Sequence, residues 1–149
     1  MTTYRLTGLM VFLAAIAVCA FAAAQSFAPV PETCIAMKAA GESGIYVNLS
    51  NEDSPEAILH IKEAVAIGHQ PRILHWDPAD ADAHRRDSLR GFPTAPGQDR
   101  DEYPPASSEE GGKGADVRLI PARDNRTAGQ RLGAVMHPYC PGTPFIIEP

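Results

Sequence analysis

The chain has 149 residues, of which 44% are hydrophobic and 21% are charged, and its formal net charge at pH 7 is −5. This length supports one hydrophobic core, and the negative balance excludes a protein that coats nucleic acid by charge alone. Nine of the 13 Lys and Arg residues nevertheless fall between Arg85 and Arg131, together with eight acids. This window is therefore nearly neutral, and it permits a phosphate site built from arginines and a divalent cation.

The N-terminal segment has the pattern of a secretory signal peptide. A basic residue precedes an almost wholly apolar run that ends on three alanines at 22–24, which is typical of a cleaved export signal. An uncleaved anchor is the alternative, although the run is short for a membrane span. A lipoprotein site at Cys19 is disfavoured because Val18 is bulky. We predict a signal peptide over 1–24 and a secreted, monomeric domain over 25–149, without stable membrane association.

Two cysteines, Cys34 and Cys140, remain after the signal peptide. In an exported chain they favour a disulfide between the two ends of the domain, and free buried thiols are the alternative. Such a bridge closes a loop of roughly 105 residues, which contributes about 4 to 5 kcal/mol in the chain-entropy model. Their wide spacing gives no support to a zinc cluster.

The first half of the domain shows two strand patterns around one helix pattern. Residues 45–49 alternate and are rich in β-formers, which predicts a strand. A helix is then predicted from Pro55, with Ser54 before it as the N-cap and Gly68 as its end. The segment PRILHW, 71–76, predicts a second, short and largely buried strand.

The next segment repeats the cap-and-proline signal. Asp77 is predicted to cap a polar helix over 78–89 that Gly91 ends. The five prolines and glycines that follow predict a loop over 92–105.

The C-terminal part predicts a strand over 115–121, a helix over 124–136 and a final strand over 144–148. Helices and strands are interspersed. We therefore predict an α+β fold: one compact domain with a small sheet, helices and long loops rich in Pro and Gly.

The residue types in the middle of the chain permit phosphodiester hydrolysis. No glycine-rich nucleotide loop, HExxH or GxSxG motif is present. What remains is a set of carboxylates near arginines, with Asp77 at the end of a strand. Carboxylates bind Mg²⁺ or Mn²⁺ and leave water on the ion, while arginines stabilise the charge that develops on a phosphate. Acidic loops are common, so composition alone leaves a solvated surface loop as the simpler interpretation.

The order of motifs between 75 and 129 closely resembles the NucA/NucB family of secreted deoxyribonucleases, and the NucB type most closely. An Asp closes a strand, an RR-x-SL helix follows, and a Pro/Gly loop leads into DRDEYP. An EGG turn, a GADV strand and a PA-x-DNR-x-AG segment complete the order. The resemblance implies a secreted, divalent-metal-dependent endonuclease that hydrolyses DNA with little sequence specificity.

The resemblance also implies roles for individual residues. Glu110 of the EGG turn is expected to bind the metal, and Asp77 is expected to orient metal-bound water or to act as its base. His75, two residues before Asp77, is a third catalytic candidate, either as a base or as a donor to Asp77. Asp77, Asp101 and Glu102 are expected to complete the metal site with Glu110, and the expected phosphate-binding residues are Arg100, Asn125 and Arg126.

Several of these residues have a simpler interpretation, and one segment departs from the family. Asp77 can be only a helix cap, Glu109 competes with Glu110, and Arg100 can pair with Asp99 or Glu102. Arg85 and Arg86 resemble a solvated helix face, and His60 resembles a structural histidine. Where some relatives carry a polar pair, this chain has Gly-Ala-Val at 133–135. The alternative function is therefore a secreted binding module with weakened catalysis, and RNA is an alternative substrate.

Overall fold

A computed structural model describes residues 34–36, 44–49 and 52–149 of the chain. The predicted signal peptide, 1–24, lies outside these residues. Within the described part of the chain, no helix has the length and apolar character needed to cross a membrane.

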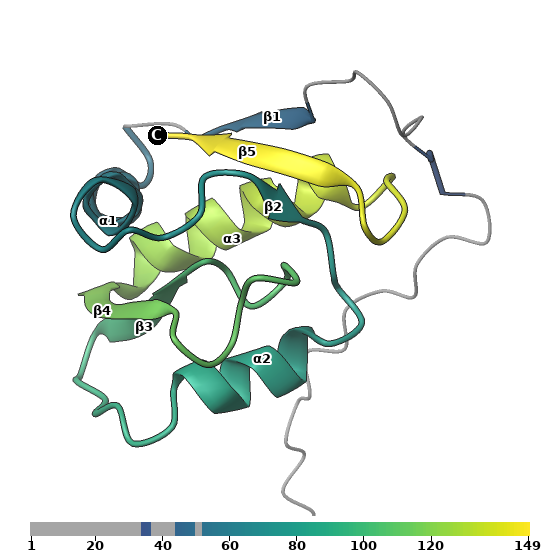
Figure 1. The fold of residues 1–149 in the computed structure, drawn as a ribbon. Coiled ribbons are helices and arrows are strands. Elements are labelled where there is room, and N and C mark those ends of the chain that lie inside the picture. The colour runs from purple at the N-terminus through teal and green to yellow at the C-terminus, as the bar shows by residue number, and fades with distance from the viewer. Residues whose placement is uncertain (1–33, 37–43, 50–51) are drawn as a thin grey trace, which may run out of the picture.

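A three-stranded sheet forms one part of the fold (Figure 1). Its strands are β1 (Ile45–Asn48), β2 (Leu74–His75) and β5 (Pro144–Glu148), in the order β1-β5-β2. β1 runs parallel to β5, and β2 runs antiparallel to it. The central strand is therefore the last in the sequence.

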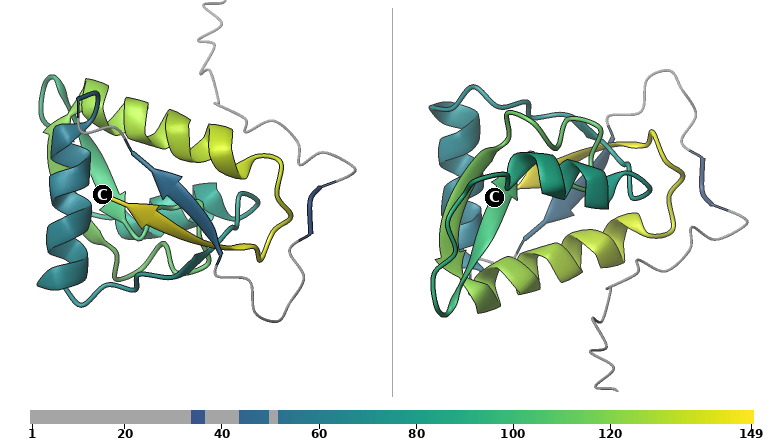
Figure 2. Two further views of the ribbon diagram at one scale, coloured as in Figure 1. Left: turned by 90° about the horizontal axis from the view of Figure 1, so that it is seen from above. Right: turned by 90° about the horizontal axis from the view of Figure 1, so that it is seen from below.

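A separate antiparallel hairpin is made by β3 (Gln98–Tyr103) and β4 (Asp116–Pro121), and α3 (Ala122–Met136) follows it directly. α1 (Pro55–Ala66) packs against α3 and against both hairpin strands. α2 (Ala81–Ser88) lies apart from α1 and α3. Figure 2 shows it behind the three-stranded sheet when the molecule is seen from above, and in front of the sheet when it is seen from below. The fold is α+β, as predicted from the order of elements.

One hydrophobic core joins these elements. It is built from apolar side chains of the sheet, the hairpin, α1 and α3, with α1 and α3 each contributing a stripe at helical spacing. Its fully buried members include Val47, Leu74, Met136 and Phe145. Trp76 and Phe145 meet edge to face, with ring centroids 6.4 Å apart.

The prediction of a loop over 92–105 is wrong for its second half, because Gln98–Tyr103 forms β3. An apolar alternation is missing from this strand: only Tyr103 is buried. Its charged side chains instead find partners on other elements. Asp99 binds Arg126 and Asp101 binds His60, so the strand is stabilised by polar contacts that a sequence pattern does not reveal.

The predicted start of the second helix is also wrong. α2 begins at Ala81, so Asp80 and not Asp77 occupies the N-cap position. The backbone N–H of Asp77 donates to the carbonyl of Ser107 (2.8 Å), which extends the pairing of β2 with a distant loop. Asp77 Oδ1 accepts a hydrogen bond from the N–H of Asp80 (3.4 Å) within the turn that leads to the helix.

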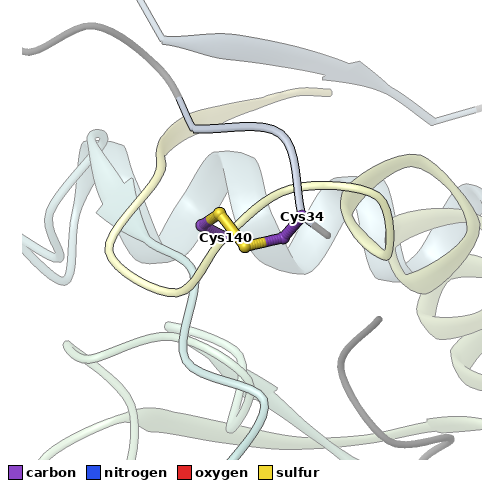
Figure 3. The surroundings of a disulfide bond; sticks show 2 residues. All are labelled: Cys34 and Cys140. Atoms are coloured by element: carbon purple, nitrogen blue, oxygen red, sulfur yellow. A yellow bond between two sulfur atoms is a disulfide. The ribbon is translucent and has the colours of Figure 1, made fainter. Parts of the chain in front are cut away.

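The predicted disulfide is present and joins Cys34 to Cys140, with 4.9 Å between their Cα atoms (Figure 3). Two backbone hydrogen bonds flank it, from Ile35 N–H to Pro138 O (2.8 Å) and from Cys140 N–H to Ile35 O (3.1 Å). Together these contacts attach residues 34–36 to the connection between α3 and β5.

Candidate active site

The loop that follows β3 is fixed along β2 by its backbone. Glu109 N–H donates to the carbonyl of His75 (2.9 Å), and Trp76 and Ser108 form an isolated antiparallel bridge. On its other side, Trp76 exchanges hydrogen bonds with Thr143 and Gly142 before β5. Residues 75–77 are therefore held between two segments, so their side chains have a fixed position relative to Glu109 and Glu110.

Glu110 holds His75 through two contacts. Its Oε2 accepts the backbone N–H of His75 (2.9 Å), and its Oε1 lies 2.6 Å from Nδ1 of the imidazole. The His75 side chain is 41% exposed and that of Glu110 is 23% exposed, so both remain accessible to a ligand. When Nδ1 donates its hydrogen to Glu110, Nε2 becomes the ring nitrogen with a free lone pair.

Glu109 completes a group of three possible metal ligands, which we call the His75–Glu109–Glu110 group. One ligand atom from each residue can be chosen so that all three lie within 4.8 Å of one another. Two carboxylates and an imidazole suit a divalent cation such as Mn²⁺, and the carboxylate oxygens also suit Mg²⁺. The donor set therefore fits the kind of ion that the sequence predicts.

The two glycines after Glu110 are required by the loop itself. A Cβ on Gly111 would lie 2.6 Å from the carbonyl oxygen of Pro105. Gly112 has φ +88°, a left-handed conformation that favours glycine, and it packs against His84 of α2. These glycines allow the turn that places Glu110 beside His75.

Asp77, two residues after His75, is half-buried. Its predicted role as a helix cap is not realised, and the carboxylate that His75 contacts is that of Glu110, 35 residues away in sequence, and not that of Asp77. Asp77 contacts the start of α2 only through the long hydrogen bond from Asp80 to its Oδ1 (3.4 Å).

Asp101 lies on the inner side of the hairpin, where it binds a buried histidine. Its Oδ2 is 2.7 Å from Nδ1 of His60, whose Nε2 is 3.2 Å from Oδ1 of Asp116. Burial acts to lower the pKa of His60, but the hydrogen bonds and charges of the two carboxylates prevail, so the pKa is raised overall. His60 is structural, as expected, and the structure does not bring Asp101 into the His75–Glu109–Glu110 group.

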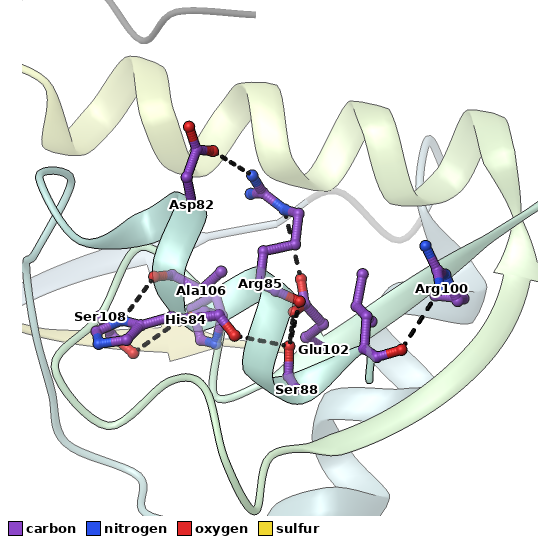
Figure 4. A network of polar contacts seen from close by, with 10 residues as sticks. Asp82, His84, Arg85, Ser88, Arg100, Glu102, Ala106 and Ser108 are labelled. Atoms are coloured by element: carbon purple, nitrogen blue, oxygen red, sulfur yellow. Dashed lines mark hydrogen bonds and ion pairs between the residues drawn. The ribbon is translucent and has the colours of Figure 1, made fainter. Parts of the chain in front are cut away.

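Glu102 likewise lies away from the group, against α2 (Figure 4). It accepts a hydrogen bond from Ser88 Oγ, and its Oε2 is 3.7 Å from Nε of Arg85. Its side chain is only 9% exposed, and burial raises the pKa of the Glu102 carboxyl. Asp101 and Glu102 thus attach β3 to α1 and α2.

The three predicted phosphate-binding residues occupy separate places. Arg100 does not pair with Asp99 or Glu102: its Nη1 donates to the carbonyls of Phe92 (3.2 Å) and Leu89 (3.5 Å). Arg126 forms a two-pronged pair with Asp99 (2.9 and 3.2 Å). Asn125 lies beside it on α3, and its side chain makes no hydrogen bond with the described residues.

Residues 78–148 match the sequence profile of a family described as deoxyribonuclease NucA/NucB. This segment of the chain belongs to the NucA/NucB family. A curated relative, the "DNA-entry nuclease" of Bacillus subtilis (strain 168), is 42% identical over 92 residues. That alignment spans 62% of this chain and 62% of the relative.

The NucA/NucB segment contains Glu109 and Glu110 but begins one residue after Asp77. His75 and Asp77 therefore precede the family match, and the fold brings His75 to Glu110 by pairing β2 with the loop after β3.

Two features of the site were not predicted from the sequence. One is the contact between His75 and Glu110, and the other is the place of Glu109 beside them both. The sequence signal for both was the adjacent pair of glutamates before two glycines, because it marked a turn with a choice of ligands. It did not identify the partner, which comes from a distant strand.

Proposed function

We propose that the chain is a secreted endonuclease that depends on a divalent metal and hydrolyses DNA phosphodiester bonds with little sequence preference. Membership of residues 78–148 in a deoxyribonuclease family supports the reaction type. The observation that supports the site most directly is the pair of contacts between Glu110 and His75, with Glu109 beside them. The disulfide between Cys34 and Cys140 supports export to an oxidising compartment.

In this proposal, His75, Glu109 and Glu110 would hold the cation, which is Mg²⁺ or Mn²⁺. A bound divalent cation supplies polarisation of a phosphoryl oxygen and a lower pKa for water. Glu110 also has a second role, because its bond to Nδ1 orients the imidazole and sets its tautomer, as second partners of metal-binding histidines generally do.

Asp77 is assigned the role of the base that accepts the proton of the attacking water. Its backbone is fixed by Ser107, and one carboxylate oxygen accepts a long hydrogen bond from Asp80, which leaves the other oxygen for the water. A carboxylate on a fixed backbone beside the metal group can accept that proton while the phosphodiester is attacked. Arg100, held against the end of α2, is assigned to the charge on the phosphate backbone.

A plasmid-nicking assay tests this function. Oxidised protein should convert supercoiled plasmid to nicked and linear forms with Mg²⁺ or Mn²⁺, and EDTA should stop the reaction. Glu110→Gln should abolish nicking, whereas the exposed control Glu52→Gln should keep it. Absence of metal-dependent cleavage by the folded wild type would contradict the proposal and favour a non-catalytic binding module, and a parallel RNA substrate separates the two nucleic acids.

A further inference from the structure

A pocket of about 370 Å³ lies between α2 and β3, outside the His75–Glu109–Glu110 group. Its lining, which we call the arginine pocket, consists of Asp82, Arg85, Arg86, Leu89 and Arg100. The size falls in the range of pockets that bind small ligands or single groups of larger ones. Three of its five lining residues carry a guanidinium, in a chain whose net charge is −5.

Two of the guanidinium groups are oriented by the fold. Arg100 is held by the carbonyls of Leu89 and Phe92 through Nη1 alone, so its other N–H groups have no acceptor among the described residues. Arg85 lies between Glu102, 3.7 Å from its Nε, and Asp82, 3.3 Å from its Nη1. Figure 4 shows Arg85 reaching from α2 toward Asp82, above Glu102, with Arg100 farther to the right.

The third guanidinium, that of Arg86, is exposed and forms no hydrogen bond or ion pair with the described residues. Among the described residues, Asp82 is the only acid that lines the pocket, and its side chain is 72% exposed. Such an exposed carboxylate turns away readily, because a surface pair of this kind is weak. The pocket therefore offers unused guanidinium donors, and fixed guanidinium forks match phosphate oxygens.

The helix that lines the pocket, α2, also contacts the loop that carries the metal group, through a residue outside the pocket. His84, next to Arg85 on α2, places its Nδ1 3.1 Å from the carbonyl oxygen of Ala106. Gly112, two residues after Glu110, packs against the same histidine. A nucleic acid strand that has one phosphate at Glu110 can thus continue along α2 toward the arginines.

We propose that the arginine pocket binds a backbone phosphate of the DNA strand, adjacent to the phosphodiester that is cleaved. This assignment rests on the proposed function for its ligand, but the binding itself needs no metal. In this proposal Arg86 and Arg100 contact the substrate directly, and Asp82 competes with the phosphate for Arg85.

The pocket can be tested without cleavage by measuring binding to a labelled single-stranded oligonucleotide in EDTA. Fluorescence anisotropy monitors this binding over a range of salt concentrations. Arg86→Gln should weaken binding roughly three- to tenfold and reduce the slope of log affinity against log salt by about 0.7. Asp82→Asn should have the opposite effect and tighten binding. The matched control is Arg90→Gln, which removes the same charge from an exposed residue outside the pocket, and it should bind as the wild type does.

The proposal is overturned if Arg86→Gln binds like Arg90→Gln, if Asp82→Asn fails to tighten binding, or if the wild type does not bind in EDTA at low salt. A titration with inorganic phosphate distinguishes a site for a free anion from a site for a nucleic acid strand. If phosphate shifts the arginine Nε–H NMR signals but Arg86→Gln leaves the affinity for DNA unchanged, the pocket binds only a free anion and the proposal is overturned. Plasmid nicking is scored separately. Binding that follows these predictions without metal-dependent nicking would refute the proposed nuclease and leave the pocket standing.

Discussion

His60 and Asp101 form a contact that joins α1 to the hairpin: Nδ1 of the fully buried imidazole lies 2.7 Å from Oδ2 of the carboxylate. Asp116, directly after the GA of the GADV segment, binds the second ring nitrogen (3.2 Å). Because both ring nitrogens face carboxylates, both can donate a hydrogen bond at the same time only when the imidazole is protonated. The hairpin strands are thus joined to α1 through a histidine whose pKa is raised.

The first prediction concerns the pH dependence of stability. The folded state holds the proton on His60 more tightly than the unfolded chain does, so its contribution is fully present below the ordinary pKa of 6.5. The free energy of unfolding should fall as the pH rises from there through the higher, folded-state pKa. Urea unfolding at a series of pH values measures this fall. His60→Gln should remove it, whereas the exposed control His137→Gln should retain it.

The same contact predicts the cost of losing the imidazole. His60→Ala leaves the charges of Asp101 and Asp116 without the imidazole that they share. Breaking a buried pair generally costs about 3 to 5 kcal/mol, and because Asp116 is 37% exposed we expect a loss at the lower end of this range. Urea unfolding below pH 6.5 measures this loss. Equal stability of His60→Ala and the wild type under those conditions would contradict a stabilising role for the buried imidazole.

How far the sequence predicts this fold is seen by comparing β4 with β3. The alternation in 115–121 and the helical stripe in α1 are local signals of burial, and both elements form as predicted. β3 has no such signal, because its charged side chains are satisfied by His60, Ser88 and Arg126, which are all distant in sequence. Periodicity detects a shared apolar face and is silent about such partners.

The candidate site shows the same limit. Glu110 and Asp77 could be named through a family resemblance, but the partner of His75 could not, since Glu110 reaches it only after the loop pairs with β2. Asp101 and Glu102 matched the chemistry of metal ligands equally well by residue type. Their contacts with His60 and Ser88 separate them from the site, and those contacts depend on which side of β3 each carboxylate occupies.

The two adjacent glutamates should differ in catalysis. Glu110→Gln removes a ligand and also the acceptor that orients His75, so metal affinity or activity should fall by at least about 10- to 100-fold. Glu109→Gln removes a more exposed ligand that leaves the His75 contact intact, so its loss should be smaller and partly reversed by excess metal. Metal titrations of nicking activity measure both. A larger loss of nicking activity from Glu109→Gln than from Glu110→Gln would make Glu109 the more important ligand and contradict this prediction.

Reduction of the disulfide should destabilise the protein without altering the metal group. Cys34 and Cys140 attach residues 34–36 to the segment before β5, whereas the side chain of His75 is held by Glu110 from the loop after β3. A Cys34→Ser/Cys140→Ser variant should lose about 2 to 4 kcal/mol of unfolding free energy, measured by urea denaturation. Its nicking rate at low temperature, where it stays folded, should match the wild type.

The glycines provide a pair of substitutions with opposite signs. Gly111→Ala would place a methyl group 2.6 Å from Pro105 O and 3.0 Å from Ser108 O, both backbone atoms. The loop must then shift, so we expect about 1 to 3 kcal/mol of destabilisation and a loss of nicking as Glu110 moves. Gly129→Ala on α3 meets nothing within 4 Å, and it should instead stabilise the helix by roughly 0.5 to 1 kcal/mol. Thermal unfolding and nicking of the two variants measure both effects; if Gly111→Ala kept full stability and activity, the tight turn would not be what positions Glu110.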